Sequence, residues 1–302
     1  MGTYRRHVTC AIGCAAITIV SAGCHLFEKI QDGNPATPTA PTAPAPASPI
    51  RYTALGASDA VGVGASVICV PLTPCDNGTG YVPQLAQRLR TNRDVRLTNI
   101  GIPAAVLSPT IQQIAQANGR DVPANFIDRE MPFVPSDATL VTILGGPNDV
   151  NALGDAIQRG AAGSTALRTY IDTQVRAFGT DYDRLVRGVR SRAPDAFIIV
   201  LNVPNMAGLP YAATYTTPQK QALQAIAAGF SREANRQAGP GVVVLDVMCD
   251  TQTYDRSRYA SDGFHPNDSG YAYIADRLLA VVNGATPGVA SSCVQMTLVP
   301  PL

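Results

Sequence analysis

Short runs of mainly apolar residues recur along the chain, and stretches with helical spacing separate them. The runs cover residues 52–56, 95–100, 139–144, 197–202 and 242–246. The last three consist almost entirely of aliphatic and β-branched residues, which is typical of strands buried on both faces of a parallel sheet. The pattern therefore predicts a five-stranded sheet.

Apolar residues at helical spacing predict the segments between these strands. A helix with Pro83 in its first turn comes first, and a long helix over residues 167–189 follows, opened by Ser164. Another helix starts at Thr217, and Asn267 caps the last one. Alternation of this kind predicts an α/β class fold, a doubly wound parallel sheet between two helical layers, whose functional groups lie at the carboxyl ends of the strands.

The first 50 residues differ from the rest. Two arginines precede an apolar stretch over residues 10–20, and small residues lead to Cys24, which resembles the lipid-attachment box of bacterial lipoproteins. A proline-rich segment over residues 35–49 predicts an extended spacer. We expect an export signal over residues 1–24, a linker over 25–50 and one domain over 51–302. A true membrane anchor is the alternative, but the apolar run is short for a bilayer.

Charge and cysteine content narrow the class of protein. A net charge of +1 with 15% charged residues is far from that of a nucleic-acid binder. With Cys24 lipidated, four cysteines remain after the signal and can pair in an oxidising compartment. Pairing Cys69 with Cys75 and Cys249 with Cys293 is one of three connectivities. Zinc binding is the competing interpretation, but neither close ligand spacing nor clustered histidines support it.

Ser58 lies in a stretch of small residues, "LGASDAVGVG", directly after the first expected strand. Such a stretch allows either a phosphate or a reactive side chain to approach the backbone. The glycine spacing matches neither a P-loop nor a dinucleotide fingerprint, and no lysine follows. The phosphate interpretation is therefore weak.

His265 is the only histidine of the expected domain, so a histidine-based site has one candidate. Asp262 lies three residues before it, close enough for a turn to bring the carboxylate to the imidazole. Gly101 and Asn148 follow the second and third strands and can donate hydrogen bonds to a developing oxyanion. Taken singly, each of these residues also fits an ordinary turn or helix cap.

Their joint order resembles the SGNH hydrolase superfamily, also called GDSL esterases and lipases. Its four blocks correspond here to "LGASDAVG", "NIGIP", "GGPND" and "SDGFHPN". The resemblance implies a three-layer, flavodoxin-like fold and a serine esterase that needs no metal or cofactor. It implies Ser58 as nucleophile, His265 as base and Asp262 as its partner. It also implies Ser58, Gly101 and Asn148 as oxyanion donors.

Two alternatives remain. An α/β-hydrolase places its nucleophile after several strands and its acid well before its histidine, unlike this chain. A lipid-anchored binding protein can use an inactive copy of the same fold. The expected partners are ester substrates, either small molecules or acylated glycans and lipids, and the membrane through the lipid on Cys24. Residues 118–136 are expected to form an irregular loop over the site.

Overall fold

The computed structural model describes residues 40–302. The expected export signal, Cys24 and the proline-rich residues 35–39 lie outside this range, so what the sequence indicates for them stays a prediction. Residues 40–302 form one compact unit. Within them, no helix combines the length and the hydropathy that a membrane crossing requires.

A parallel sheet of five strands forms the centre of the fold, as the apolar runs predict. The strands are β1 (Ile50–Gly56), β2 (Val95–Asn99), β3 (Leu140–Leu144), β4 (Phe197–Leu201) and β5 (Val242–Leu245), in the spatial order β2-β1-β3-β4-β5. Strand β1 starts two residues before the expected run, because Ile50 pairs with Val95 and is fully buried.

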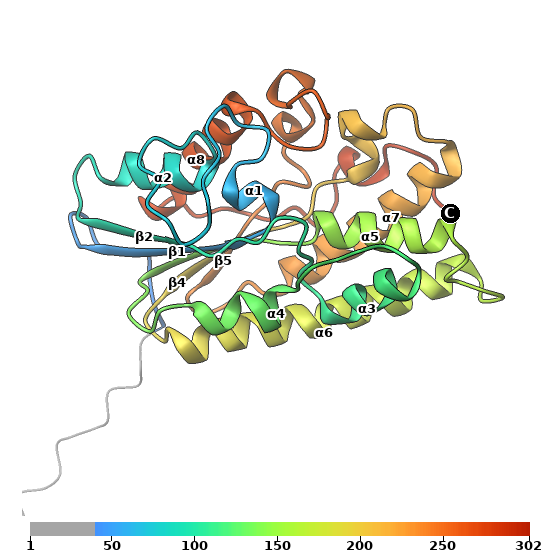
Figure 1. Cartoon of the computed structure of the whole chain (residues 1–302), viewed down its shortest axis with the longest axis horizontal. Coiled ribbons are helices and arrows are strands. Elements are labelled where there is room, and N and C mark those ends of the chain that lie inside the picture. Colours follow the sequence, from blue (N-terminus) through green and yellow to red (C-terminus); the bar gives the residue numbers. More distant parts are fainter. Residues whose placement is uncertain (1–39) are drawn as a thin grey trace, which may run out of the picture. The chain divides into compact units, whose positions relative to one another are not determined.

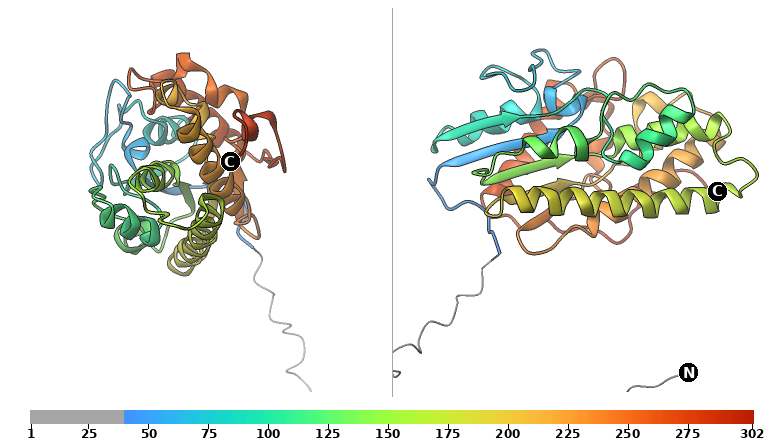
Figure 2. Two further views of the ribbon diagram at one scale, coloured as in Figure 1. Left: turned by 90° about the vertical axis from the view of Figure 1, so that its right-hand side faces the viewer. Right: turned by 60° about the horizontal axis from the view of Figure 1, so that its bottom comes forward.

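Helices cover both faces of this sheet (Figures 1 and 2). On one face α2 (Tyr81–Leu89) packs on α8 (Asp268–Val282). The other face carries α3 (Pro109–Ala117), α4 (Phe126–Arg129), α5 (Pro147–Gln158), α6 (Leu167–Arg192) and α7 (Thr217–Asn235). Figure 1 shows α2 and α8 above the sheet and α4 and α6 below it.

Two hydrophobic cores result from this arrangement, because successive side chains of a strand point to opposite faces. In β4, Ile199 and Leu201 join the core beneath α2 and α8, whereas Ile198 and Val200 join the core beneath α6 and α7. Burial on both faces explains why this strand has no polar positions. The three-layer α/β/α fold is thereby confirmed.

Three local predictions differ in outcome. Asn267 caps α8 by accepting from two amides of its first turn, as predicted. Ser164 does not cap α6, which begins at Leu167 after Ala166. Residues 118–136 are not wholly irregular, because they contain α4 and a 3-10 turn, Met131–Phe133.

Candidate active site

Ser58 lies in a crowded turn at the carboxyl end of β1. It is the first residue of the short helix α1 (Ser58–Val61) and is 7% exposed. A Cβ atom on Gly56 would come within 2.8 Å of the Ala60 side chain, and one on Gly101 within 2.6 Å. The small residues are therefore needed because α1 and the loop after β2 approach each other so closely.

His265 and Asp262 reach this serine from the loop before α8. The distance from His265 Nε2 to Ser58 Oγ is 2.8 Å, and that from His265 Nδ1 to Asp262 Oδ2 is 2.6 Å. A proton on Nδ1, facing the carboxylate, leaves Nε2 free to accept the proton of the serine hydroxyl. The three side chains thus form one continuous hydrogen-bonded chain.

Backbone amides hold Asp262 in this orientation. Its Oδ1 accepts from the N–H groups of Phe264, at 2.9 Å, and His265, at 3.0 Å. Burial raises the pKa of Asp262, but the hydrogen bonds from the His265 ring and from these two amides outweigh burial and lower it below its ordinary value. The carboxylate therefore stays ionised and favours an imidazolium whenever His265 takes a proton.

Packing also fixes the imidazole ring. The Phe264 ring lies edge-on to it, with the ring centroids 4.8 Å apart. On another side the backbone of Gly64 lies so close that a Cβ atom there would come within 2.8 Å of the His265 Cβ. The ring is thus restricted in position before any substrate binds.

The three expected oxyanion donors differ in their present partners. Ser58 is the first residue of α1, so its N–H has no partner within the helix. Asn148 Nδ2 donates to the Ala105 carbonyl at 2.9 Å, which leaves its second hydrogen for another acceptor. The Gly101 N–H, by contrast, donates to Asn99 Oδ1 at 3.1 Å. Gly101 is therefore not a free donor in this structure, because the side chain two residues earlier folds back onto it.

Two buried acids near these loops were not anticipated as functional. Glu130 is fully buried, and its Oε2 accepts from the Gly56 N–H at 2.9 Å, below the nucleophile turn. Asp149 is also fully buried and accepts from the amides of Leu107 and Ser108, at 2.8 and 2.9 Å. The position of Asp149 directly after Asn148 could have indicated a role near the site, whereas nothing in the sequence around Glu130 does so.

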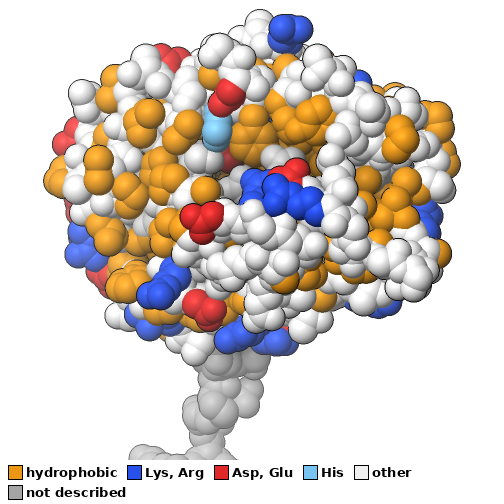
Figure 3. Space-filling model, turned by 45° about the vertical axis from the view of Figure 1, so that its right-hand side comes forward, with side chains coloured by type: hydrophobic (Ala, Val, Ile, Leu, Met, Phe, Trp, Pro, Cys, Tyr) orange, Lys and Arg blue, Asp and Glu red, His pale blue; other side chains and the backbone are white. Residues whose placement is uncertain are grey.

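A pocket extends from the catalytic loops over the carboxyl ends of β3, β4 and β5. Its volume is about 790 Å³ with its open mouth included. Asp59, Pro147 and Phe264 line it, and these are direct neighbours of Ser58, Asn148 and His265. Figure 3 shows the histidine beside a hollow lined by hydrophobic side chains.

The four cysteines after the linker form two disulfides. Cys69 pairs with Cys75, and Cys249 pairs with Cys293. These bonds use the thiolates that the zinc interpretation would require. Within residues 40–302, no group of three or more His, Cys, Asp or Glu side chains is arranged to hold a metal ion.

Known proteins resemble this chain in sequence and in fold. The profile of the GDSL-like lipase/acylhydrolase family matches residues 54–273. Among curated protein sequences, none is significantly similar. A lipase from a goat rumen metagenome is 19% identical, with a TM-score of 0.53, over 77% of this chain and 97% of the lipase.

A second solved structure is an acetyl xylan esterase from Geobacillus stearothermophilus. It is 14% identical, with a TM-score of 0.51, over 81% of this chain and 98% of the esterase. At such identities the two structures establish a shared fold, and the family profile covers well over half of the sequence. The chain therefore belongs to the GDSL-like lipase/acylhydrolase family, which places it among the carboxylic ester hydrolases.

Proposed function

We propose that this protein is a serine esterase that cleaves carboxylic esters through a covalent acyl-enzyme, with Ser58 as nucleophile. The observation that carries the proposal is the hydrogen-bonded chain from Ser58 Oγ through His265 to Asp262. This arrangement has the three roles that acyl transfer needs, a nucleophile, a base and a group that orients the base.

In the first half-reaction His265 Nε2 takes the hydroxyl proton while Ser58 Oγ attacks the ester carbonyl. The resulting imidazolium is stabilised by Asp262 and then protonates the leaving alcohol. In the second half-reaction His265 takes a proton from water, which attacks the acyl-enzyme. Collapse of that intermediate releases the acid and returns the proton to Ser58.

The oxyanion of each tetrahedral intermediate needs donors close to Ser58. We assign the Ser58 N–H and the second Asn148 Nδ2 hydrogen to this role. The Gly101 N–H can join them only as a shared donor, since Asn99 already accepts from it. Two donors therefore carry most of the stabilisation, and Gly101 contributes less than the family resemblance implies.

We also propose that the protein acts outside the cytoplasm, with Cys24 as its lipid anchor. Two disulfides in one domain support an oxidising compartment. Ester-bearing small molecules, lipids and acylated glycans are the substrate classes that this setting offers.

The test is hydrolysis of p-nitrophenyl esters from acetate to palmitate by the full chain and by Ser58→Ala. Loss of Oγ removes the nucleophile, so turnover should fall by about 10⁴-fold or more, to the background rate. A fluorophosphonate probe should label the parent protein at Ser58 and leave the variant unlabelled.

Ser191→Ala, an exposed serine on α6, is the matched control and should retain full activity. Hydrolysis that persists in Ser58→Ala would exclude Ser58 as the nucleophile. A chain that neither hydrolyses any ester nor reacts with the probe would be a binding protein on this fold.

A further inference from the structure

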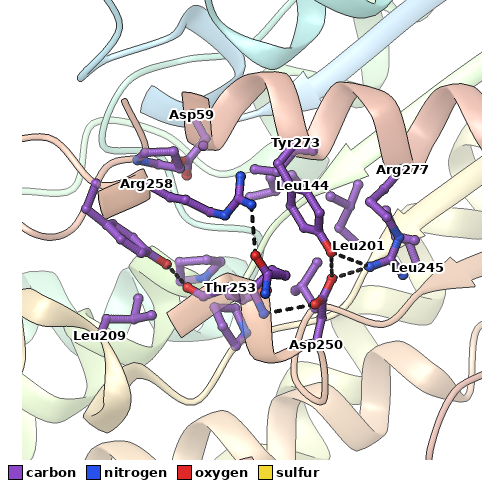
Figure 4. Close-up of a pocket in the computed structure, with 18 of the residues that line it drawn as sticks. Asp59, Leu144, Leu201, Leu209, Leu245, Asp250, Thr253, Arg258, Tyr273 and Arg277 are labelled. Atoms are coloured by element: carbon purple, nitrogen blue, oxygen red, sulfur yellow. Dashed lines mark hydrogen bonds and ion pairs between the residues drawn. The ribbon is translucent and has the colours of Figure 1, made fainter. Parts of the chain in front are cut away.

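The pocket beside the catalytic loops has an apolar floor. Leu144, Leu201 and Leu245, the last residues of β3, β4 and β5, line it together with Met206 and Leu209 from the segment after β4 (Figure 4). An apolar chain that leaves the reacting carbonyl can lie here, since burial of its methylene groups away from water favours binding.

One end of the pocket is polar, and most of its charges are paired with one another. Arg277 forms an ion pair with Asp250, and Tyr273 Oη donates to Asp250 Oδ2 at 2.7 Å (Figure 4). Burial raises the pKa of Asp59, the acid on the opposite side, so its carboxyl holds a proton more readily than usual. Asp250 is therefore already paired with Arg277 and Tyr273.

Arg258 is paired less closely, by a single long ion pair with Asp255. Its guanidinium stacks on the Tyr273 ring, 4.4 Å from the ring centre, and donates to Gln252 Oε1 at 2.8 Å. A long contact of 3.5 Å reaches the Ser269 carbonyl. The buried Nε–H has no hydrogen-bond partner within residues 40–302. Such a donor is costly to leave unpaired.

The nearest carboxylate does not remove this positive charge from the pocket. Asp255 Oδ2 lies 3.8 Å from Arg258 Nε, too far for a hydrogen bond, and its side chain is 44% exposed. Its other oxygen already accepts from the Ser257 amide and hydroxyl. Asp255 is not among the residues that line the pocket.

We infer that this pocket binds an ester whose apolar chain ends in a carboxylate, and that Arg258 is the residue that selects the carboxylate. The inference rests on the proposed esterase function and names its substrate class. A guanidinium held by an aromatic ring presents its N–H groups in the planar arrangement that a carboxylate accepts. The apolar floor accommodates the chain between the ester and this charge.

Esters of equal chain length test the selection. On the acyl side, p-nitrophenyl hexanoate is compared with mono-p-nitrophenyl adipate. On the alcohol side, hexyl acetate is compared with 6-acetoxyhexanoate, which carries a carboxylate at the end of the chain. At neutral pH the added carboxyl is ionised. We expect the full chain to favour the charged ester of at least one pair in kcat/KM.

Arg258→Met removes the charge and retains an apolar side chain over Tyr273. It should lower kcat/KM for the favoured charged ester by about 10- to 150-fold, the value of a hydrogen bond to a charged group. The neutral ester of the same pair should change by less than about threefold, because the triad is untouched. Arg258→Lys retains the charge and should keep part of the preference, and Arg168→Met, on the exposed face of α6, should keep all of it.

The inference would be overturned if the ratio of kcat/KM for the charged ester to kcat/KM for the neutral ester were the same in the parent protein and in Arg258→Met. This must hold for the acyl-side pair and for the alcohol-side pair. If Arg258→Met unfolds, Arg258→Lys decides the question. A charged-to-neutral ratio of kcat/KM in Arg258→Lys equal to that of the parent protein would then overturn the inference, because the planar guanidinium has been replaced. If the neutral esters too are not hydrolysed, the esterase proposal itself has failed.

A measurement without catalysis separates the two failures. Hexanoate should raise the Tm of the parent protein more than 1-hexanol does, because a ligand stabilises the folded state that binds it. This difference should disappear in Arg258→Met. Equal shifts with both ligands in the parent protein would contradict the pocket's preference whatever the activity.

Discussion

At the scale of single residues, Asn148 and Asp149 are adjacent in the chain but perform different tasks. Asn148 directs its amide toward the loop after β2 and retains one unused hydrogen. Asp149 points into the core and ties the amides of Leu107 and Ser108 to the start of α5. The pair thereby links the candidate oxyanion donor to a rigid support.

Asn148→Ala tests the donor assignment. An oxyanion donor acts mainly in the transition state, so kcat should fall by about 10²- to 10³-fold while KM changes little. Steady-state kinetics on one p-nitrophenyl ester measure both constants. Gln158→Ala, at the other end of α5, should behave like the parent protein. A near-normal kcat in Asn148→Ala would remove this side chain from the mechanism.

Asp149 should make stability depend on pH. Burial raises the pKa of Asp149 to about 7, although the hydrogen bonds from Leu107 and Ser108 oppose the rise. A raised pKa means that the folded state holds the proton more tightly than the unfolded chain does. The stabilisation is complete below about pH 4 and is lost as the pH rises through about 7, with a slope of up to about 1.4 kcal/mol per pH unit.

Urea unfolding of the parent protein and of Asp149→Asn across this range measures the effect. The variant cannot ionise at this position, so its unfolding free energy should vary less with pH. Asp172→Asn, an exposed position on α6, should follow the parent curve. Parallel curves for the parent and Asp149→Asn would show that this carboxyl does not titrate in the range.

The residue types and their order along the chain predicted which side chains meet at the site. Acyl transfer needs a nucleophile, a base and a group that orients the base, and few residue types can fill these roles. A single histidine in the domain left one candidate base. Glu130 could not be predicted in the same way. Its partner, the Gly56 N–H, is 74 residues away and carries no side chain that could reveal the contact.

At the scale of elements, the strands were more predictable than the helices. Strands buried on both faces are marked by uninterrupted apolar runs, which turns rarely imitate. Helix α5 begins inside "GGPND", where glycine, proline and asparagine suggested a turn. Pro147 is nevertheless compatible with a helix, because it occupies the first helical position, where no N–H partner is needed.

The two disulfides should contribute unequally to stability. Cys249 and Cys293 are separated by 44 residues, whereas Cys69 and Cys75 are separated by six. In the chain-entropy model the longer loop is worth about 4 kcal/mol and the shorter about 2 kcal/mol. Replacing both cysteines of a pair with serine and measuring urea unfolding tests the order. A larger loss from the Cys69 and Cys75 pair would contradict the model for this protein.

At the scale of the whole molecule, the order β2-β1-β3-β4-β5 brings the functional loops together. The order reverses between β1 and β3, and Ser58, Gly101 and Asn148 follow β1 and its two neighbours. Loops that follow adjacent parallel strands emerge at the same edge of the sheet. His265 arrives at this edge from the start of α8, so one edge collects all the catalytic candidates.

Local sequence patterns were enough to predict the α/β class, the strands and the triad candidates. Periodicity and residue chemistry are local properties, and they can be read without knowing what lies opposite. Three further features depend on the packed structure: Asn99 accepts from the Gly101 amide, Glu130 accepts from the Gly56 amide, and Arg258 lines a pocket and has an unpaired Nε–H. These facts depend on distances between segments and on burial, because whether a polar group has a partner is settled only when distant parts of the chain pack together.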